Sequence, residues 1–316
     1  MNDVALALVH RRMVRLYKED MLMKETVKLI GNTPLYHIEN TDIYVKLEKY
    51  NIGGSVKDRA VLRMLQGAME KGEITKDSVL VEATSGNTGV ALAMLGAVYH
   101  IPVTIIMPDT MSMERRQLVR AYGATLVLTP GAKGMQGAME EMERLMKEHD
   151  NYRSLSQFDN PDNINAHYET TGREILEQLP DVDLFVACIG TGGTFSGIAK
   201  RLKEHDPAIL CMAGEPEKSA ILSGREAGPH KIQGIGANFV PANFDRELAD
   251  DILLISDQEA VFETVRFARE TGILVGISSG ANIALAKRLS LRYPGKKIVT
   301  VAPDGGEKYL SVLDFD

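Results

Sequence analysis

Short apolar runs rich in β-branched residues alternate with amphipathic segments along almost the whole chain. The runs 79–84, 103–108 and 125–130 show this well, because each is followed by apolar residues that recur at helical spacing. Such alternation is typical of parallel sheets that are covered by helices on both faces. The 316 residues are enough for two domains or for one large α/β unit.

The same pattern predicts the remaining elements. Further strands are expected at 44–48, 183–189, 209–214, 251–255, 273–277 and 298–303. A long helix is expected around 163–179, and Ser256 with Glu259 forms a capping box for a helix that starts at 257. Residues 216–250 lack clear periodicity, and a segment of this length is too long for an idle connection, so we expect a functional loop there.

Composition excludes several classes of function. The net charge of −7 argues against nucleic acid or an anionic membrane as the main partner. Cys188 and Cys211 are the only two cysteines and form no CxxC pair, which fits a reducing cytoplasm and argues against a zinc site; we expect buried thiols and no metal. The first 20 residues lack the charge order of a signal peptide and are expected to form an amphipathic surface helix. The apolar run 90–108 is interrupted and is interpreted as a helix followed by a strand, not as a membrane span.

Lys57 lies in the stretch GGSVKDRA, where a helix is expected to begin. Ser55 and Asp58 have the spacing of a capping arrangement at its start. A cation in the first turn is unfavourable, because the helix dipole places positive partial charge there. Lys57 therefore either points into water or belongs to a site that benefits from a lysine that loses its proton easily.

Three strand-to-helix junctions are rich in Gly, Ser and Thr: TSGNTG at 84–89, GTGGTFSG at 190–197 and GISSGAN at 276–282. In open parallel sheets, ligands bind beyond the carboxyl ends of the strands, and helix N-termini there bind anions. Small residues can also simply form tight turns, but three such loops at corresponding positions argue against that interpretation.

Two better-known motifs do not fit these loops. The 190–197 loop has Phe195 where a dinucleotide-binding fingerprint needs its third glycine, although Glu215 ends the next strand, and no Gly-Lys-Ser/Thr follows for a Walker loop. GISSG matches a nucleophile elbow, but a hydrolase of that class needs a histidine after Ser278, and the last histidine is His230. What remains is a cradle of backbone donors for a phosphate.

An easily deprotonated lysine, a phosphate cradle without a nucleotide-binding lysine, and a serine at a third loop suggest pyridoxal phosphate. In such enzymes a lysine holds the aldehyde as an imine and the cofactor serves as the electron sink. The position of Lys57 at a helix N-terminus would then favour its neutral amine.

The sequence resembles the cysteine synthase (O-acetylserine sulfhydrylase) family of fold type II, tryptophan-synthase-β-like pyridoxal-phosphate enzymes. The resemblance extends from about residue 30 to about residue 310. It rests on GNTPL (31–35), GGSVKDR (53–59), EATSGNTG (82–89), ERRQLVRAYGA (114–124), QFDNPDN (157–163), GTGGTFSG, QGIG (233–236) and GISSGA.

The resemblance implies a role for each matching residue. Lys57 would hold the cofactor as an imine and move the α-proton, Asn87 would bond the phenolic oxygen of the cofactor, and Ser278 would face the pyridine nitrogen. The phosphate would be held by Gly190, Thr191, Gly192, Gly193 and Thr194. The substrate would be bound by Thr84, Ser85, Gly86, Thr88 and Gln157, with Gly234 in the loop above its amino-acid part.

The implied fold has two three-layer domains with mostly parallel, twisted sheets: a smaller, mobile domain at 46–160, and a cofactor-phosphate domain made of 1–45 with 161–316. The implied reaction is β-replacement, in which O-acetylserine loses acetate to give an α-aminoacrylate and sulfide adds to give cysteine. The resemblance also implies a cytoplasmic homodimer, and the C-terminal peptide of serine acetyltransferase is a candidate partner.

Two alternatives stay open. One is an enzyme that replaces the β-substituent of serine or cysteine and makes cystathionine or lanthionine, or releases sulfide. The other is a non-catalytic regulatory protein on the same scaffold. Asn238 bears on the first alternative, because the family often has glycine there and related serine- or cysteine-using enzymes often have an acidic residue.

Overall fold

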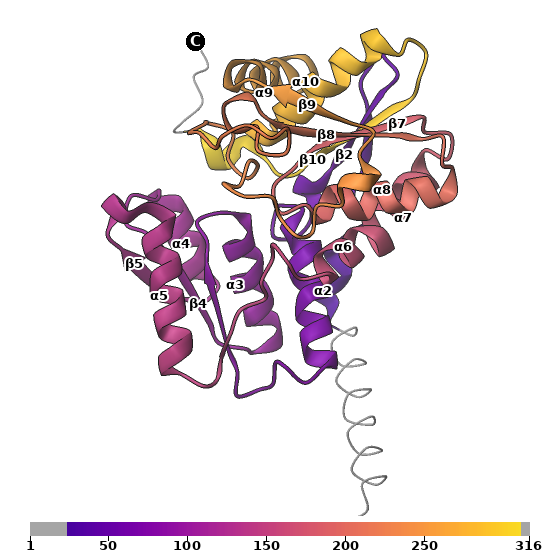
Figure 1. Ribbon diagram of the computed structural model, residues 1–316. Coiled ribbons are helices and arrows are strands. Elements are labelled where there is room, and N and C mark those ends of the chain that lie inside the picture. The colour runs from indigo at the N-terminus through magenta and orange to yellow at the C-terminus, as the bar shows by residue number, and fades with distance from the viewer. Residues whose placement is uncertain (1–23, 311–316) are drawn as a thin grey trace, which may run out of the picture. The chain divides into compact units, whose positions relative to one another are not determined.

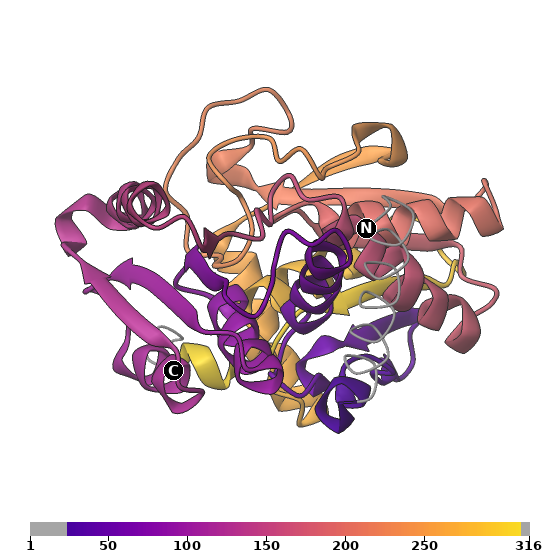
Figure 2. The same cartoon turned by 90° about the horizontal axis from the view of Figure 1, so that it is seen from below.

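The computed structural model describes residues 24–310 and divides into two compact units (Figures 1 and 2). Within the described residues, the smaller unit comprises 24–30 and Val61–Leu155, and the larger unit comprises Gly31–Ala60 and 156–310. The smaller unit shares 61–155 with the expected 46–160 domain, whereas 46–60 and 156–160 group with the larger unit. The expected amphipathic helix at the N-terminus lies outside the described residues.

The larger unit is built on a six-stranded sheet with the order β1-β2-β10-β7-β8-β9. Its strands are β1 (Leu35–His37), β2 (Ile43–Leu47), β7 (Leu184–Cys188), β8 (Leu210–Pro216), β9 (Asp251–Ile255) and β10 (Ile298–Ala302). All neighbours pair in parallel except β1 and β2, which are antiparallel. The parallel sheet of the sequence analysis is therefore confirmed, with one antiparallel edge strand that the sequence did not reveal.

Helices cover both faces of this sheet (Figure 1). One face carries α6 (Asp162–Ala166), α7 (Gly172–Gln178) and α8 (Gly193–His205), and the other carries α9 (Asp257–Thr271) and α10 (Ile277–Arg292). Short 3-10 turns lie at Glu48–Tyr50, Glu217–Ser219, Arg246–Leu248 and Gly306–Tyr309. A capping box of Ser256 and Glu259 starts α9, as predicted.

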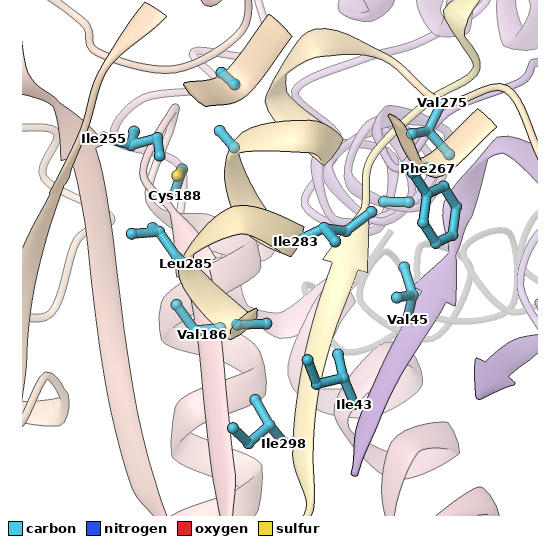
Figure 3. Packing of buried hydrophobic residues seen from close by; sticks show 14 of the residues in the cluster. Ile43, Val45, Val186, Cys188, Ile255, Phe267, Val275, Ile283, Leu285 and Ile298 are labelled. Carbon is cyan, nitrogen blue, oxygen red and sulfur yellow. The ribbon is translucent and has the colours of Figure 1, made fainter. Parts of the chain in front are cut away.

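Alternate residues of β7 enter two different cores, which explains its continuous apolar sequence. Val186 and Cys188 pack towards Leu285 of α10 (Figure 3), whereas Phe185 packs against Phe195 of α8 with ring centroids 5.7 Å apart. A strand buried on both faces has no polar side, because neighbouring side chains point in opposite directions. The carboxyl ends of β7 and its parallel neighbours β8 and β10 therefore lie side by side at one end of a sheet that is packed on both faces.

The smaller unit contains a four-stranded parallel sheet with the order β5-β4-β3-β6. Its elements are β3 (Val79–Ala83), β4 (Val103–Pro108), β5 (Thr125–Thr129), β6 (Tyr152–Arg153), α3 (Asn87–Tyr99), α4 (Met113–Ala121), α5 (Gly134–Glu148) and 3-10 turns at Glu25–Leu29 and Gly131–Lys133. Ile106 packs against α5, and its neighbour Ile105 faces Gly89 of α3. Helices thus cover both faces here too. Helix α2 (Lys57–Glu70) begins in the larger unit and continues in the smaller one.

One predicted strand and one predicted helix need correction. The run 273–277 forms no strand; Val275 makes a single bridge to Gly305, and α10 already begins at Ile277. The helix expected around 163–179 is interrupted by a π-helical stretch at His167–Thr171, between α6 and α7. Single π-turns often mark functional sites, because they turn side chains out of the regular helical register.

Three smaller expectations can be checked directly. Between β8 and β9 the described segment contains only the two short 3-10 turns and otherwise runs as a long loop (Figure 2), as its lack of periodicity indicated. Cys188 and Cys211 are both buried free thiols, and burial raises the pKa of each to about 12. No helix within residues 24–310 is long and apolar enough to cross a membrane.

Candidate active site

Lys57 is the first residue of α2, as predicted. The Ser55 hydroxyl accepts a hydrogen bond from the Lys57 backbone N–H at 3.3 Å, and the Asp58 carboxyl accepts from the Gly53 N–H at 2.6 Å and from the backbone of Ser55. Removal of the ammonium from water lowers the pKa of Lys57 to about 8, although the charge of Asp304 opposes this effect. The side chain is therefore far easier to deprotonate than an ordinary lysine.

A short segment joins the Lys57 turn to the start of α10. The Val56 N–H donates to the Pro303 carbonyl at 2.8 Å, Ser55 forms an antiparallel bridge with Asp304, and the Gly276 N–H donates to the Asp304 carbonyl at 3.0 Å. Ser278 lies buried in the first turn of α10. The main chain thus holds two predicted cofactor residues, Lys57 and Ser278, on either side of one strand-like segment.

The predicted phosphate loop, Gly190–Thr194, is called the phosphate loop below; it follows β7 and begins α8. Gly192 has φ +89°, and a Cβ there would lie 2.5 Å from the Phe244 backbone nitrogen, so only glycine fits. A Cβ at Gly190 would lie 2.2 Å from the Gly234 carbonyl oxygen. The back of the loop is therefore packed against protein, and the backbone approaches as closely as glycine allows.

The front of the phosphate loop offers hydrogen-bond donors. Among the described residues, the backbone N–H groups of residues 191–195 donate no hydrogen bond. Thr194 contacts His167 of the π-helical stretch at 3.2 Å, and His167 also contacts Thr171 at 2.9 Å. Burial lowers the pKa of His167 to about 3, so its ring is neutral. The loop therefore offers N–H groups, hydroxyls and a helix dipole, which suit an anion, and no cationic side chain is among its hydrogen-bond partners within residues 24–310.

Gln157 and Gly234 lie in the same unit as the phosphate loop. Gln157 is buried, and its backbone carbonyl accepts hydrogen bonds from Asn163 at 2.7 Å and from Asn243 at 3.0 Å. Gly234 has φ +91° and contacts Gly190. The larger unit thus contains nine of the predicted site residues: Lys57, Gln157, Gly190, Thr191, Gly192, Gly193, Thr194, Gly234 and Ser278.

The remaining predicted residues, Thr84, Ser85, Gly86, Asn87 and Thr88, lie together in the smaller unit. They form the turn between β3 and α3, and Asn87 is the first residue of that helix. The Thr84 hydroxyl accepts from the Gly86 N–H at 3.3 Å. The guanidinium of Arg115 also donates to the Ser85 carbonyl at 3.2 Å. A helix N-terminus with hydroxyls and a nearby arginine suits a carboxylate.

The larger unit also contains an ionic cluster that no sequence pattern indicated, made of Lys46, Glu48, Arg59 and Glu174. Arg59 donates to Glu48 at 2.7 Å and to Glu174 at 2.6 Å, and the Lys46 ammonium lies 2.8 Å from Glu174. All four side chains are almost fully buried and their charges sum to zero. Arg59 follows Lys57 by two residues, so this cluster anchors the first turn of α2.

The chain matches the model of the pyridoxal-phosphate dependent enzyme family over residues 27–304. It belongs to this family. It is also 47% identical over 301 residues to the cysteine synthase of Staphylococcus aureus, an alignment that covers 92% of this chain and 96% of that protein.

Solved structures of family members resemble this chain closely. A hydrogen sulfide-producing enzyme of Fusobacterium nucleatum is 48% identical with a TM-score of 0.86, covering 90% of this chain and 97% of that one. Cysteine synthase of Entamoeba histolytica is 40% identical with a TM-score of 0.88, covering 91% and 89%. An O-acetylserine dependent cystathionine β-synthase of Helicobacter pylori is 40% identical with a TM-score of 0.85, covering 90% and 96%.

The residues of this pyridoxal-phosphate dependent enzyme fit its cofactor. The glycine-lined phosphate loop has no room for a Cβ at its back and has unused N–H donors at its front. When bound, pyridoxal phosphate supplies an aldehyde for a lysine amine and an electron sink for charge at the substrate α-carbon. Lys57, with its lowered pKa, is suited to be that amine, and Ser278 remains the predicted partner of the ring nitrogen. A neutral serine need not keep that nitrogen protonated, unlike an aspartate.

Proposed function

We propose that this enzyme forms L-cysteine from O-acetylserine and sulfide by β-replacement. The observation that carries the proposal is the joint position, within one unit, of an easily deprotonated Lys57, the buried Ser278 and an uncharged phosphate loop. The name of the Staphylococcus aureus relative supports the choice of substrates.

The reaction needs residues that bind the substrate carboxylate and a residue that transfers the α-proton. The turn at 84–88 and Gln157 would hold the carboxylate of the amino-acid substrate, and Lys57 would take the proton from its α-carbon. Acetate then leaves with the electron pair of the β-carbon–oxygen bond, and the sulfur of hydrosulfide forms the new bond to the β-carbon. The Lys57 ammonium returns the proton to the α-carbon, so the lysine ends the cycle as it began.

The direct test mixes the purified holoenzyme with O-acetylserine, serine, cysteine or O-phosphoserine in separate reactions. We expect O-acetylserine to change the absorption of the bound cofactor, and added sulfide to restore it with release of cysteine and acetate. If the spectrum responds only to serine or only to cysteine, that amino acid is the donor and O-acetylserine is not. A protein that binds pyridoxal phosphate and responds to none of the donors would favour the regulatory alternative.

The second candidate function is release of sulfide from cysteine, with lanthionine or cystathionine as products. The hydrogen sulfide-producing relative of Fusobacterium nucleatum, at 48% identity, favours it. Sulfide formation from cysteine alone, at an efficiency above that of cysteine formation from O-acetylserine, would make it the main activity.

Asn238 offers a sharper test of acceptor choice. It is exposed, and it is not among the described residues with positive φ, so the backbone does not require the family's usual glycine there. An amide can donate and accept but cannot attract an ammonium as a carboxylate does. We expect Asn238→Asp to shift selectivity from sulfide towards cysteine or homocysteine by about 1 kcal/mol, or several-fold. Asn238→Gly should shift it the other way, and equal selectivity in all three proteins would make Asn238 a turn residue only.

A homodimer, the C-terminal peptide of serine acetyltransferase as a partner, and a cytoplasmic location stay predictions from the family resemblance. Light scattering of the purified protein tests the first, and titration with the peptide tests the second.

A further inference from the structure

Asn163 lies in α6 between two predicted functional segments. Its side chain is only 1% exposed. The amide nitrogen donates to the Gln157 carbonyl at 2.7 Å and to the Thr191 hydroxyl oxygen at 3.0 Å. One small side chain therefore connects the segment expected to hold the substrate carboxylate with the loop expected to hold the cofactor phosphate.

The orientation of this amide follows from its partners. A carbonyl oxygen can only accept, so the NH₂ end of Asn163 must face Gln157, and the same NH₂ group faces Thr191. The Thr191 oxygen is then an acceptor, and its hydroxyl proton remains available to a ligand. The amide oxygen of Asn163 accepts no hydrogen bond within residues 24–310, and a Cβ on Gly193 would lie 2.1 Å from it.

An unpaired buried amide oxygen costs free energy. A smaller or apolar side chain at position 163 would avoid this cost. The two bonds on the NH₂ side explain why an asparagine is useful here, because no apolar side chain could join Gln157 to Thr191.

We propose that Asn163 is a positioning residue that couples the substrate-carboxylate segment to the phosphate loop. The proposal rests on the proposed pyridoxal-phosphate function. Asn163 acts through two neighbours: it holds the Gln157 backbone in place, and it orients the Thr191 hydroxyl so that its proton points to the phosphate. Loss of Asn163 should therefore weaken two different binding events.

Asn243 provides a control that separates these two effects. Its amide donates to the same Gln157 carbonyl, at 3.0 Å, but has no hydrogen bond to the phosphate loop. Asn165 provides a neutral control, because it lies on the same helix and, within residues 24–310, its amide donates only to the Asp162 carboxyl, at 3.1 Å.

The experiment measures the dissociation constant of pyridoxal phosphate from apoprotein by equilibrium dialysis, and KM and kcat for the amino-acid donor of the holoenzyme. We expect Asn163→Ala to weaken cofactor binding about tenfold and to raise the donor KM roughly fivefold with a smaller change in kcat. Asn243→Ala should raise the donor KM and leave cofactor binding within twofold of the parent. Asn165→Ala should change neither quantity.

A double-mutant cycle tests whether Asn163 acts through Thr191. The loss of cofactor affinity caused by Thr191→Val should be several-fold smaller in the Asn163→Ala background than in the parent protein, because the hydroxyl is no longer oriented there. Unchanged cofactor binding in Asn163→Ala, or losses that simply multiply, would overturn the proposal. Asn163→Leu, which keeps the branched heavy-atom skeleton of the side chain, replaces the alanine variant if that variant does not fold.

The cofactor measurements do not depend on which amino acid is the donor. A wrong donor assignment would therefore leave them intact and change only the substrate used for KM. Conversely, a chain that binds no pyridoxal phosphate at all would overturn the proposed function before Asn163 is tested.

Discussion

The two ends of the predicted cofactor site in the larger unit are built from opposite kinds of chemistry. The Lys57 end rests on the ionic cluster of Lys46, Glu48, Arg59 and Glu174, whose charges are paired inside the protein. The phosphate loop is shaped by glycines, threonines, Asn163 and the neutral His167. Both ends begin a helix, so the difference does not come from the secondary structure.

The electrostatics of the ionic cluster show what its charges do. Burial alone would raise the pKa of Glu174, but hydrogen bonds and charge from Arg59, together with a bond from Lys46, hold it at about 2. Arg59 lowers the pKa of Glu48 against the same effect of burial. These carboxylates remain ionised at any ordinary pH. Because their charges are balanced by Arg59 and Lys46, they do little to raise the pKa of Lys57.

The phosphate loop leaves its field unneutralised. Its free N–H groups and the N-terminus of α8 carry partial positive charge. Within residues 24–310, no carboxylate accepts a hydrogen bond from these N–H groups. At the Lys57 end the charged side chains are paired with one another, whereas the N–H groups of the phosphate loop stay available to a ligand. Mutations at the two ends should therefore have different consequences.

The largest expected effect is loss of turnover in Lys57→Ala. No other group is predicted to take the α-proton, so we expect β-replacement to fall to background while the circular dichroism spectrum stays that of the parent. Pyridoxal phosphate should still bind non-covalently through the phosphate loop. The cofactor absorption of the dialysed variant checks that the cofactor is bound, and borohydride reduction followed by mass measurement checks that it is not covalently attached. Full activity of the variant would remove the central role of Lys57.

A mutation in the ionic cluster should lower the free energy of unfolding. Glu174→Gln leaves Arg59 and Lys46 with too little negative charge, and removal of one partner from a buried ion pair costs about 3–5 kcal/mol. We expect that loss in urea unfolding of the apoprotein. The exposed pair of Lys133 and Glu140, 3.1 Å apart, gives the control: Glu140→Gln should leave the free energy of unfolding almost unchanged. Equal losses in the two variants would contradict the structural role of the cluster.

The sequence predicted much of this arrangement, and particular residues show where it could not. Lys57, the phosphate loop and Ser278 stand out because glycine-rich turns after apolar runs are local patterns. Glu174 bonds Arg59 across 115 positions of the chain, and no local pattern reveals such a pair. The run 273–277 has the composition of a strand, but the early start of α10 at Ile277 leaves it only one bridge.

The lowered pKa of Lys57 predicts how the stability of the apoprotein depends on pH. The unfolded chain binds this proton up to a pKa of 10.5, and the folded chain only up to about 8, so between these values the unfolded state holds more protons. The free energy of unfolding should therefore rise with pH through this window, by at most about 3 kcal/mol from this group. Below pH 8 the cost of the buried ammonium is fully present.

Lys57→Met isolates that contribution, because other groups also titrate between pH 8 and 10.5. The difference in unfolding free energy between variant and parent should favour the methionine variant at pH 7 and shrink towards pH 10.5. A difference that does not change with pH would show that the Lys57 ammonium is well solvated in the apoprotein.

The smallest effect is expected at the phosphate loop, and it should appear in binding instead of stability. Thr194→Val removes a hydroxyl donor from the loop, and a hydrogen bond to a charged group contributes about 1.5–3 kcal/mol. We expect pyridoxal phosphate to bind more weakly by that amount, with little change in kcat once the cofactor is saturating.

Thr170→Val is the matched control, because the Thr170 hydroxyl donates to the Ala166 carbonyl of its own helical segment. Apoprotein stability should change little in Thr194→Val, since among the described residues the Thr194 hydroxyl hydrogen-bonds only to the neutral His167, at 3.2 Å. An unchanged dissociation constant would mean that the phosphate binds elsewhere, and a loss of stability as large as that of Glu174→Gln would remove the contrast between the two ends of the site.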